Sequence, residues 1–174
     1  MIIREATNED FSRIWPVFRI VVRAGDTYSI PKDIDETGAR EVWMRAPLKT
    51  FIAEKNGTVL GTYKLNVNRA GGGDHVCNCG YMVTPEARGL GVASQMCEHS
   101  QKVALELGFK AMQYNMVVAT NEGAVRLWQK LGFGIVGTLP RAFNHPQQGY
   151  VDAYVMYKWL AGQADQPNNP QAPV

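Results

Sequence analysis

Met82-Val83-Thr84-Pro85-Glu86-Ala87-Arg88-Gly89-Leu90-Gly91-Val92-Ala93-Ser94 stands at the centre of the chain, an apolar run followed by a glycine-rich turn and a helix-forming stretch. A turn of this kind points several backbone N–H groups at one spot, at the positive end of a helix dipole. Gly89 and Gly91 let the backbone approach an anion that a Cβ would hold off, and Arg88 adds a fixed positive charge. The segment predicts a phosphate site, although glycines also form ordinary strand-to-helix turns.

The spacing of the glycines differs from two common nucleotide-binding motifs. A Rossmann motif, Gly-x-Gly-x-x-Gly, would need a glycine where this chain has Ser94. The Gly-Lys-Ser/Thr of a Walker loop is absent as well. A phosphate site here is therefore of a third kind.

The composition is that of one soluble globular domain. The chain has 174 residues, of which 45% are hydrophobic and 20% are charged. A net charge of +2 argues against a nucleic-acid or membrane partner. No apolar run approaches membrane-spanning length, and residues 1–5 predict a strand instead of a signal peptide. We therefore expect a cytoplasmic protein.

The three cysteines, Cys77, Cys79 and Cys97, fit a reducing compartment, and their odd number argues against a disulfide framework. His75, Cys77 and Cys79 alternate along a predicted strand and share a face, which makes a metal site conceivable. Neighbours at i and i+2 lie roughly 6.5 Å apart, which is wide for sulfurs around one zinc ion. We expect no metal, and we expect Cys77 and Cys79 to be small buried side chains.

Hydrophobic periodicity and turn residues predict the elements that precede the glycine turn. Asn8 or Asp10 is the candidate cap of the first helix, and Pro16 either begins that helix or kinks it. Asn56-Gly57 predicts a hairpin because both residues tolerate positive φ. In chain order we expect a strand at residues 2–4, a helix from about residue 11 to Gly25, a helix at residues 34–45, and strands at residues 50–54 and 58–67.

The second half of the chain alternates strands and helices. We expect a strand at residues 75–83, a helix after the glycine turn that ends at Gly108, a strand at residues 111–118, a helix from Asn121 to Gly132, and strands at about residues 133–139 and 150–159. The order β-α-α-β-β-β-α-β-α-β-β predicts an α/β (α+β) fold with a mixed sheet and helices on both faces.

We assign residues 1–161 to this one domain. Residues 162–174 are rich in Pro, Asn, Gln and Ala and should not pack by themselves. One hypothesis is that a neighbouring subunit holds this tail, which would make the protein a homodimer. The alternative is that only a crystal-packing contact would hold the tail, with no dimer in solution.

Two segments together carry a family resemblance. Arg88-Gly89-Leu90-Gly91-Val92-Ala93 matches the Arg/Gln-x-x-Gly-x-Gly/Ala loop of the GCN5-related N-acetyltransferases (GNAT family). The run from Asn121 to Phe133 resembles their second signature, Asn-x-x-Ala-x-x-Leu-Tyr-x-x-x-Gly-Phe. The resemblance covers roughly residues 1 to 160. It implies the GNAT fold, with a mostly antiparallel sheet of about seven strands that splays between the fourth and the fifth.

The resemblance implies acetyl-CoA binding. Backbone amides would hold the pyrophosphate, and the pantetheine arm would pair with the exposed strand edge at Met82 and Val83. The thioester would lie near Asn115, whose amide either makes a core hydrogen bond or contacts the substrate. The remaining residues expected to contact the coenzyme are Arg88, Gly89, Leu90, Gly91, Val92, Ala93, Ser94, Asn121 and Trp128.

The implied reaction is direct acyl transfer to an amine. A base or a water relay takes a proton from the ammonium group, a backbone N–H on the fourth strand stabilises the oxyanion, and an acid returns a proton to the thiolate. Family members commonly use the tyrosine of the second signature as that acid. This chain has Trp128 there, and indole cannot donate a proton at useful pH. Another group serves, or the thiolate leaves unassisted.

The base is not evident from the sequence. The fourth strand lacks the Glu or Asp that some members place in its middle. Candidates are Asp74, His75, Glu54 and Asp152, and a water chain that ends on backbone carbonyls is an alternative.

The acceptor site is expected under the loop at residues 24–31 and near residues 149–152. Both stretches resemble acetyltransferases for small amino acids and analogues, including phosphinothricin-type enzymes. We expect Tyr28, Asn115 and Tyr150 as catalytic or acceptor-binding groups, with Asn144 as a further donor and residues 143–145 as a wall. The predicted function is acetyl-CoA-dependent acetylation of a small amine. The alternatives are a CoA-binding module without turnover and a protein N-terminal or lysine acetyltransferase.

Overall fold

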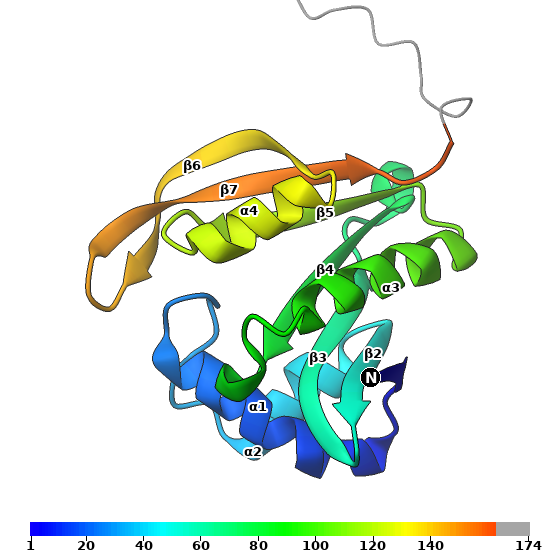
Figure 1. The fold of residues 1–174 in the computed structure, drawn as a ribbon. Helices are drawn as coiled ribbons and strands as arrows, with labels where there is room; N and C mark the ends of the chain where they lie inside the picture. Colours follow the sequence, from blue (N-terminus) through cyan, green and yellow to red (C-terminus); the bar gives the residue numbers. More distant parts are fainter. Residues whose placement is uncertain (163–174) are drawn as a thin grey trace, which may run out of the picture.

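A computed structural model describes residues 1–162 (Figure 1). The predicted tail lies outside these residues apart from Gly162, and so does its hypothetical contact with a second subunit. The predicted order of strands and helices is confirmed. The elements are β1 (Ile2–Glu5), α1 (Phe11–Ala24), α2 (Glu36–Arg40), β2 (Lys49–Lys55), β3 (Thr58–Val67), β4 (Val76–Val83), α3 (Val92–Glu106), β5 (Ala111–Val118), α4 (Glu122–Lys130), β6 (Gly134–His145) and β7 (Gly149–Trp159).

The seven strands form one sheet in the order β1-β2-β3-β4-β5-β7-β6. Every neighbouring pair is antiparallel except β4 and β5, which are parallel. The β4–β5 register holds only two pairs, Val76 with Ala111 and Cys77 with Met112. Beyond these pairs the strands diverge, and Figure 1 shows β5–β7 rising away from β2–β4. The splay predicted between the fourth and the fifth strand is therefore present.

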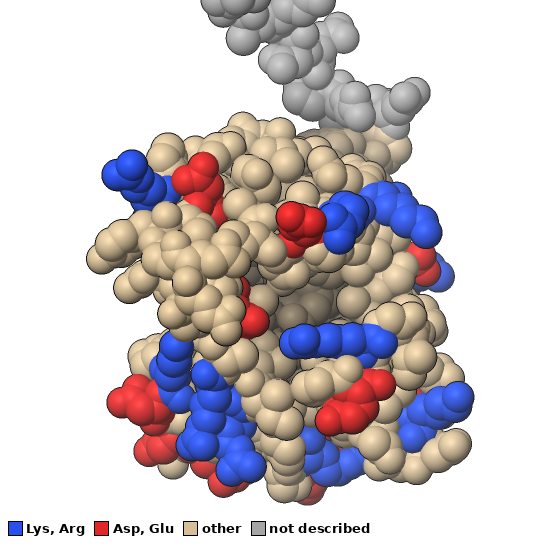
Figure 2. Space-filling view, turned by 60° about the vertical axis from the view of Figure 1, so that its left-hand side comes forward, with Lys and Arg blue, Asp and Glu red and all other residues tan. Residues whose placement is uncertain are grey.

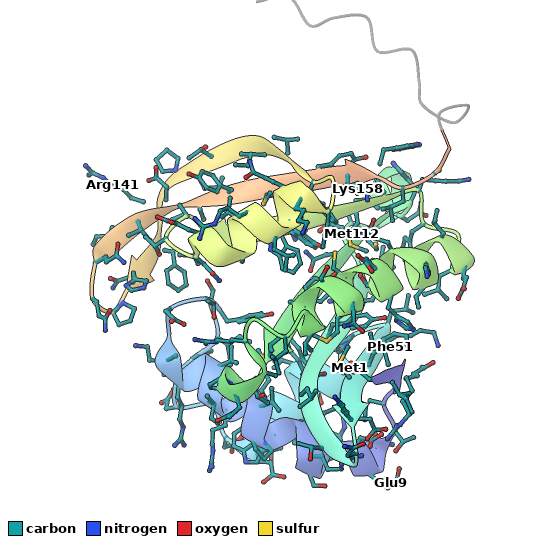
Figure 3. The ribbon with its side chains drawn as sticks, in the orientation of Figure 1. Met1, Glu9, Phe51, Met112, Arg141 and Lys158 are labelled. Atoms are coloured by element: carbon teal, nitrogen blue, oxygen red, sulfur yellow. The ribbon has the colours of Figure 1, made fainter. Side chains whose placement is uncertain are left out.

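The two faces of the sheet carry separate cores because side chains alternate along each strand. On β2, Phe51 belongs to the cluster under α3 and α4, whereas Ile52 packs with α1 and the segment after α2. Met112 of β5 lies in the first cluster with no exposed surface. Figure 3 labels Phe51 and Met112, which come from different halves of the splayed sheet.

Helix α1 runs through Pro16, so of the two alternatives for this proline, the one in which it begins the helix is wrong. Phe11, Ile14 and Phe18 are fully buried on one face, and this burial holds the helix together across the missing N–H of proline. Asp10 occupies the N-cap position of α1, but its side chain makes no capping hydrogen bond to this helix. Its carboxylate accepts the Thr7 N–H at 2.9 Å instead.

The helix predicted at residues 34–45 is shorter and changes type. Regular α2 ends at Arg40, and Glu41–Arg45 continues as one π-helical turn. Asp35 caps α2 by accepting the Gly38 N–H at 2.7 Å. The predicted hairpin between β2 and β3 is confirmed, with φ of 51° at Asn56 and 77° at Gly57. Within residues 1–162 there is no helix with the length and hydropathy needed to cross a membrane.

Candidate active site

A cavity of about 950 Å³ opens where β4 and β5 diverge. It extends from the glycine turn before α3 to the loop between α1 and α2, and α4 borders it. Figure 2 shows the surface hollowed at mid-height, with a Lys or Arg side chain along the lower edge of the hollow. A cavity of this size accommodates a cofactor-sized ligand.

The exposed edge of β4 is defined by the hydrogen bonds at its two ends. Thr84 N–H donates to Leu60 C=O and Asn68 N–H donates to Val76 C=O, both at 2.9 Å. In an antiparallel ladder only alternate residues pair with the neighbour. The even-numbered residues of β4 therefore bond to β3, and the N–H and C=O groups of Cys79, Tyr81 and Val83 face the gap.

This alternation corrects one expectation about the strand edge. Val83 faces the gap as expected, but the backbone of Met82 pairs with Thr62 on β3. The Met82 side chain is buried in the core under α1, although the residue also lines the cavity. Tyr81 is the second edge residue, and sequence reasoning missed it. Counting in steps of two back from Val83 would have found it.

The glycine turn is open where an anion would bind. Gly89 and Gly91 have φ of 77° and 76°, and no atom lies within 4 Å of a Cβ built on Gly89. The first hydrogen bond of α3 runs from Gln95 N–H to Gly91 C=O at 3.1 Å. The N–H groups that precede Gln95 in the first turn therefore have no partner inside the helix. They point outward at the positive end of a 15-residue helix.

Most of the predicted loop residues line the cavity. These are Arg88, Gly89, Gly91, Val92, Ala93 and Ser94. Leu90 does not, because its side chain stands in solvent with 66% exposed surface.

The second signature places two residues at the cavity wall. Asn121 caps α4 through its side-chain oxygen, which accepts the Ala124 N–H at 3.3 Å. Trp128 is buried, with its ring centroid 5.1 Å from that of Tyr81 and 5.2 Å from that of Tyr114. Both residues line the cavity. Trp128 packs between the two halves of the sheet.

Asn115 lies in a chain of amides across the gap. Its Nδ2 donates to Asn68 Oδ1, and its Oδ1 accepts from Gln113 Nε2, each at 2.8 Å. Asn78 of β4 donates from Nδ2 to the Gln113 carbonyl at 2.8 Å. Asn115 therefore makes structural hydrogen bonds and also lines the cavity, so both of its expected roles are compatible with the geometry.

Tyr28 anchors the loop that roofs the cavity. Its hydroxyl donates to the Tyr81 carbonyl on the β4 edge at 2.7 Å. A Cβ on Gly80 would lie 3.2 Å from this hydroxyl, so the absence of a side chain at Gly80 allows the approach. Burial raises the pKa of Tyr28. The phenol stays neutral and positions the loop.

Tyr150 is not brought into the site. It lies at the tip of the β6–β7 hairpin, paired with Asn144, and is 72% exposed. His145 of the same hairpin lines the cavity instead and is buried. Its Nδ1 accepts the Gln147 N–H at 3.2 Å, so the neutral ring carries its proton on Nε2.

The four candidate bases lie elsewhere. Glu54 binds Arg4 at 2.8 Å and Arg13 at 2.6 Å, and these guanidinium groups lower its pKa. Asp152 accepts the Arg141 N–H at 2.9 Å, at the register shift between Leu139 and Phe143 of β6; Figure 3 labels Arg141.

His75 packs near Trp159 at the opposite end of β4, and Asp74 precedes it in the turn. Among the described residues, the acidic residue that lines the cavity is Asp26, in the loop after α1. The sequence offered no motif that singles out Asp26.

The three cysteine thiols are free and buried. No group of three potential metal ligands occurs in the described part of the chain. Cys77 and Cys79 face the core under α3, as expected for small buried side chains.

Residues 5–133 match the model of the Acetyltransferase (GNAT) family. The chain therefore belongs to this family, as the two sequence signatures predicted. A GCN5-related N-acetyltransferase from Kribbella flavida is 41% identical, with a TM-score of 0.85 over 91% of this chain and 96% of that one. A phosphinothricin acetyltransferase from Sinorhizobium meliloti, solved in complex with acetyl-CoA, has a TM-score of 0.82 at 20% identity, over 99% of this chain and 95% of that one.

Two curated relatives are similar in sequence. N-acetyltransferase aca1 of Schizosaccharomyces pombe is 36% identical over 101 residues, which are 56% of this chain and 47% of that protein. The match thus spans about half of that relative. L-amino acid N-acetyltransferase AaaT of Escherichia coli is 26% identical over 164 residues, covering 90% of this chain and 96% of that protein.

Gly91→Glu tests the glycine turn. A glutamate would place bulk and negative charge in front of the free N–H groups of α3, so we expect the Kd for acetyl-CoA to rise about 100-fold or more. Isothermal titration calorimetry measures this change.

The matched control is Gly57→Glu in the β2–β3 hairpin. Gly57 has φ of 77° and no atom within 4 Å of a Cβ built there, so it reports the backbone cost of the same substitution far from the cavity. An unchanged Kd in Gly91→Glu, or an equal loss in both variants, would contradict the assignment of the site.

Proposed function

We propose that the protein is an acetyl-CoA-dependent N-acetyltransferase that acetylates the amine of a small molecule, an amino acid or an analogue. The observation that carries this proposal is the edge of β4 that no strand covers, which runs along the cavity as one groove from the glycine turn to the loop between α1 and α2. Unpaired N–H and C=O groups at a strand edge bind an extended ligand that has amide groups of its own. Pantetheine has two amides and fits this requirement.

Different residues of the groove would contact different parts of the coenzyme. Residues 88–94 would hold the pyrophosphate through backbone N–H groups and the Arg88 guanidinium. Val83 and the Tyr81 N–H would pair with the pantetheine amides and the thioester carbonyl, whereas the Tyr81 carbonyl already accepts the Tyr28 hydroxyl. The Tyr81 N–H is the candidate donor that stabilises negative charge on the carbonyl oxygen as the amine attacks.

Proton transfer at this site does not use a tyrosine on α4. Trp128 offers an indole N–H, which is not an acid at physiological pH. The Tyr81 and Tyr114 hydroxyls lie 3.2 Å apart in the wall beside Trp128, and burial raises the pKa of both. Asp26 is the cavity carboxylate that can take the ammonium proton, through water or directly.

An amino-acid acceptor is supported by Asp26, Thr27 and Ser29 at the end of the cavity formed by the loop between α1 and α2, and by similarity to AaaT, an L-amino acid N-acetyltransferase. Loop residues 26–30 cover that end, and an extended peptide would have to displace them.

A CoA-binding module without turnover is the second candidate, and Trp128 in place of tyrosine is the observation that favours it. The homodimer and the cytoplasmic location remain predictions.

An acceptor screen tests the proposal. The protein is incubated with acetyl-CoA and each proteinogenic amino acid or simple amine, with detection of released CoA and of the acetylated product by mass spectrometry. We expect at least one amino acid to be acetylated. Acetyl-CoA binding without product from any acceptor would instead support the binding module.

Trp128→Phe tests whether Trp128 only packs. A second aromatic ring preserves most contacts with Tyr81 and Tyr114, so we expect kcat to fall by less than about tenfold. Trp159→Phe, at the far end of β7, is the control for loss of an indole outside the cavity. A fall of a thousandfold in kcat, with unchanged thermal stability, would show that the indole takes part in the chemistry.

A further inference from the structure

Lys64 of β3 is a cation in the cavity wall that has no anionic partner within residues 1–162. Its side chain is half-buried and lines the cavity. None of the ion pairs within residues 1–162 includes Lys64. Its Nζ donates to the Val42 carbonyl at 3.1 Å and lies 5.2 Å from the centre of the Trp43 ring. An ammonium group has three N–H donors, so two remain for a ligand.

The surroundings make this charge costly without a ligand. Desolvation by burial lowers the pKa of Lys64, and no carboxylate offsets the effect. A partly desolvated ammonium group is stabilised when an anion enters the cavity. Thr27 lines the same cavity, and its Oγ1 is buried without a hydrogen-bond partner in the described part of the chain.

The position of Lys64 places it at the acceptor end of the groove. Lys64 pairs in register with Gly80, the residue next to Tyr81 on β4. A Cβ on Gly80 would lie 3.8 Å from the Trp43 ring and 3.2 Å from the Tyr28 hydroxyl, so Lys64, Tyr28 and Trp43 surround one small patch of strand. Arg88, the cation of the glycine turn, is separated from this patch along β4 by residues 81–87.

We propose that Lys64 binds the carboxylate of the acceptor and that the acceptor is therefore an α-amino acid with a free carboxyl group. This inference rests on the proposed function and assigns its substrate class. The amine of an α-amino acid is two bonds from its carboxylate carbon. A carboxylate held over Gly80 would thus keep the amine close to Tyr81, where the thioester carbonyl is proposed to bind.

The test compares each accepted amino acid with its primary amide, which has the same amine and side chain but no negative charge. For the wild type we expect kcat/KM to be at least about tenfold higher for the acid, because a charge-assisted hydrogen bond contributes about 1.5–3 kcal/mol. Lys64→Met should reduce kcat/KM for the acid by about 10- to 100-fold and for the amide by less than about threefold. The ratio between the two substrates should then approach one.

Lys158→Met is the matched control. Lys158 of β7 also donates to a backbone carbonyl, that of Leu131 at 2.8 Å, and its Nζ lies 5.8 Å from the Phe133 ring, but it lies outside the acceptor cavity. Figure 3 labels it on β7. The control should keep the wild-type ratio between acid and amide. If Lys64→Met does not fold, Lys64→Gln takes its place, and an unchanged Kd for acetyl-CoA confirms an intact site.

The outcomes separate this inference from the proposed function. A wild type that acetylates amides as well as acids, or a Lys64→Met variant that loses both equally, would overturn the role of Lys64 while leaving the transferase in place. If no acceptor is acetylated, the proposed function fails, and calorimetry on the CoA-saturated protein with N-acetyl-amino acids then decides. Binding to the wild type that is lost in Lys64→Met supports the carboxylate site, and absent or equal binding refutes it.

Discussion

The site depends on backbone groups of β4 that have no strand to pair with. Two residue pairs join β4 to β5, and the strands then separate. In a continuous sheet the N–H and C=O groups of Cys79, Tyr81 and Val83 would bond to β5. Leaving such groups buried and unpaired would cost about 1–3 kcal/mol each. An open cavity avoids that cost because water or an extended ligand can reach them.

An aromatic cluster keeps the two halves of the sheet apart. Tyr81 of β4 and Tyr114 of β5 meet edge to face, with ring centroids 5.9 Å apart, and Trp128 of α4 packs on both. These rings fill the gap on the α3–α4 side, where side chains of smaller volume would let the strands close. On the other side Tyr28 ties the α1–α2 loop to the Tyr81 carbonyl. The same tryptophan that departs from the family signature thus has a structural role.

The sequence predicted the features that depend on local chemistry. Gly89 and Gly91 defined the turn, Asn56-Gly57 the hairpin and Asn121 the beginning of α4, because each requires a particular residue at one position. The sequence was less informative about features that depend on how distant parts of the chain pack together. The backbone of Met82 was assigned to the open edge of β4 but pairs with β3, and Tyr150 was assigned to the site but lies exposed at the tip of a hairpin. Nothing local marks Asp26 or Lys64, since only the folded chain brings a loop after α1 and a residue of β3 to one cavity.

Amide hydrogen exchange measured by NMR, with and without saturating acetyl-CoA, tests the account most directly. The amides of Tyr81 and Val83 face the gap and should exchange at least about tenfold more slowly with the coenzyme bound. Those of Gly80 and Met82 already donate to β3 and should change little. Unchanged exchange at Tyr81 and Val83 under saturation would contradict the claim that the free edge of β4 binds the coenzyme.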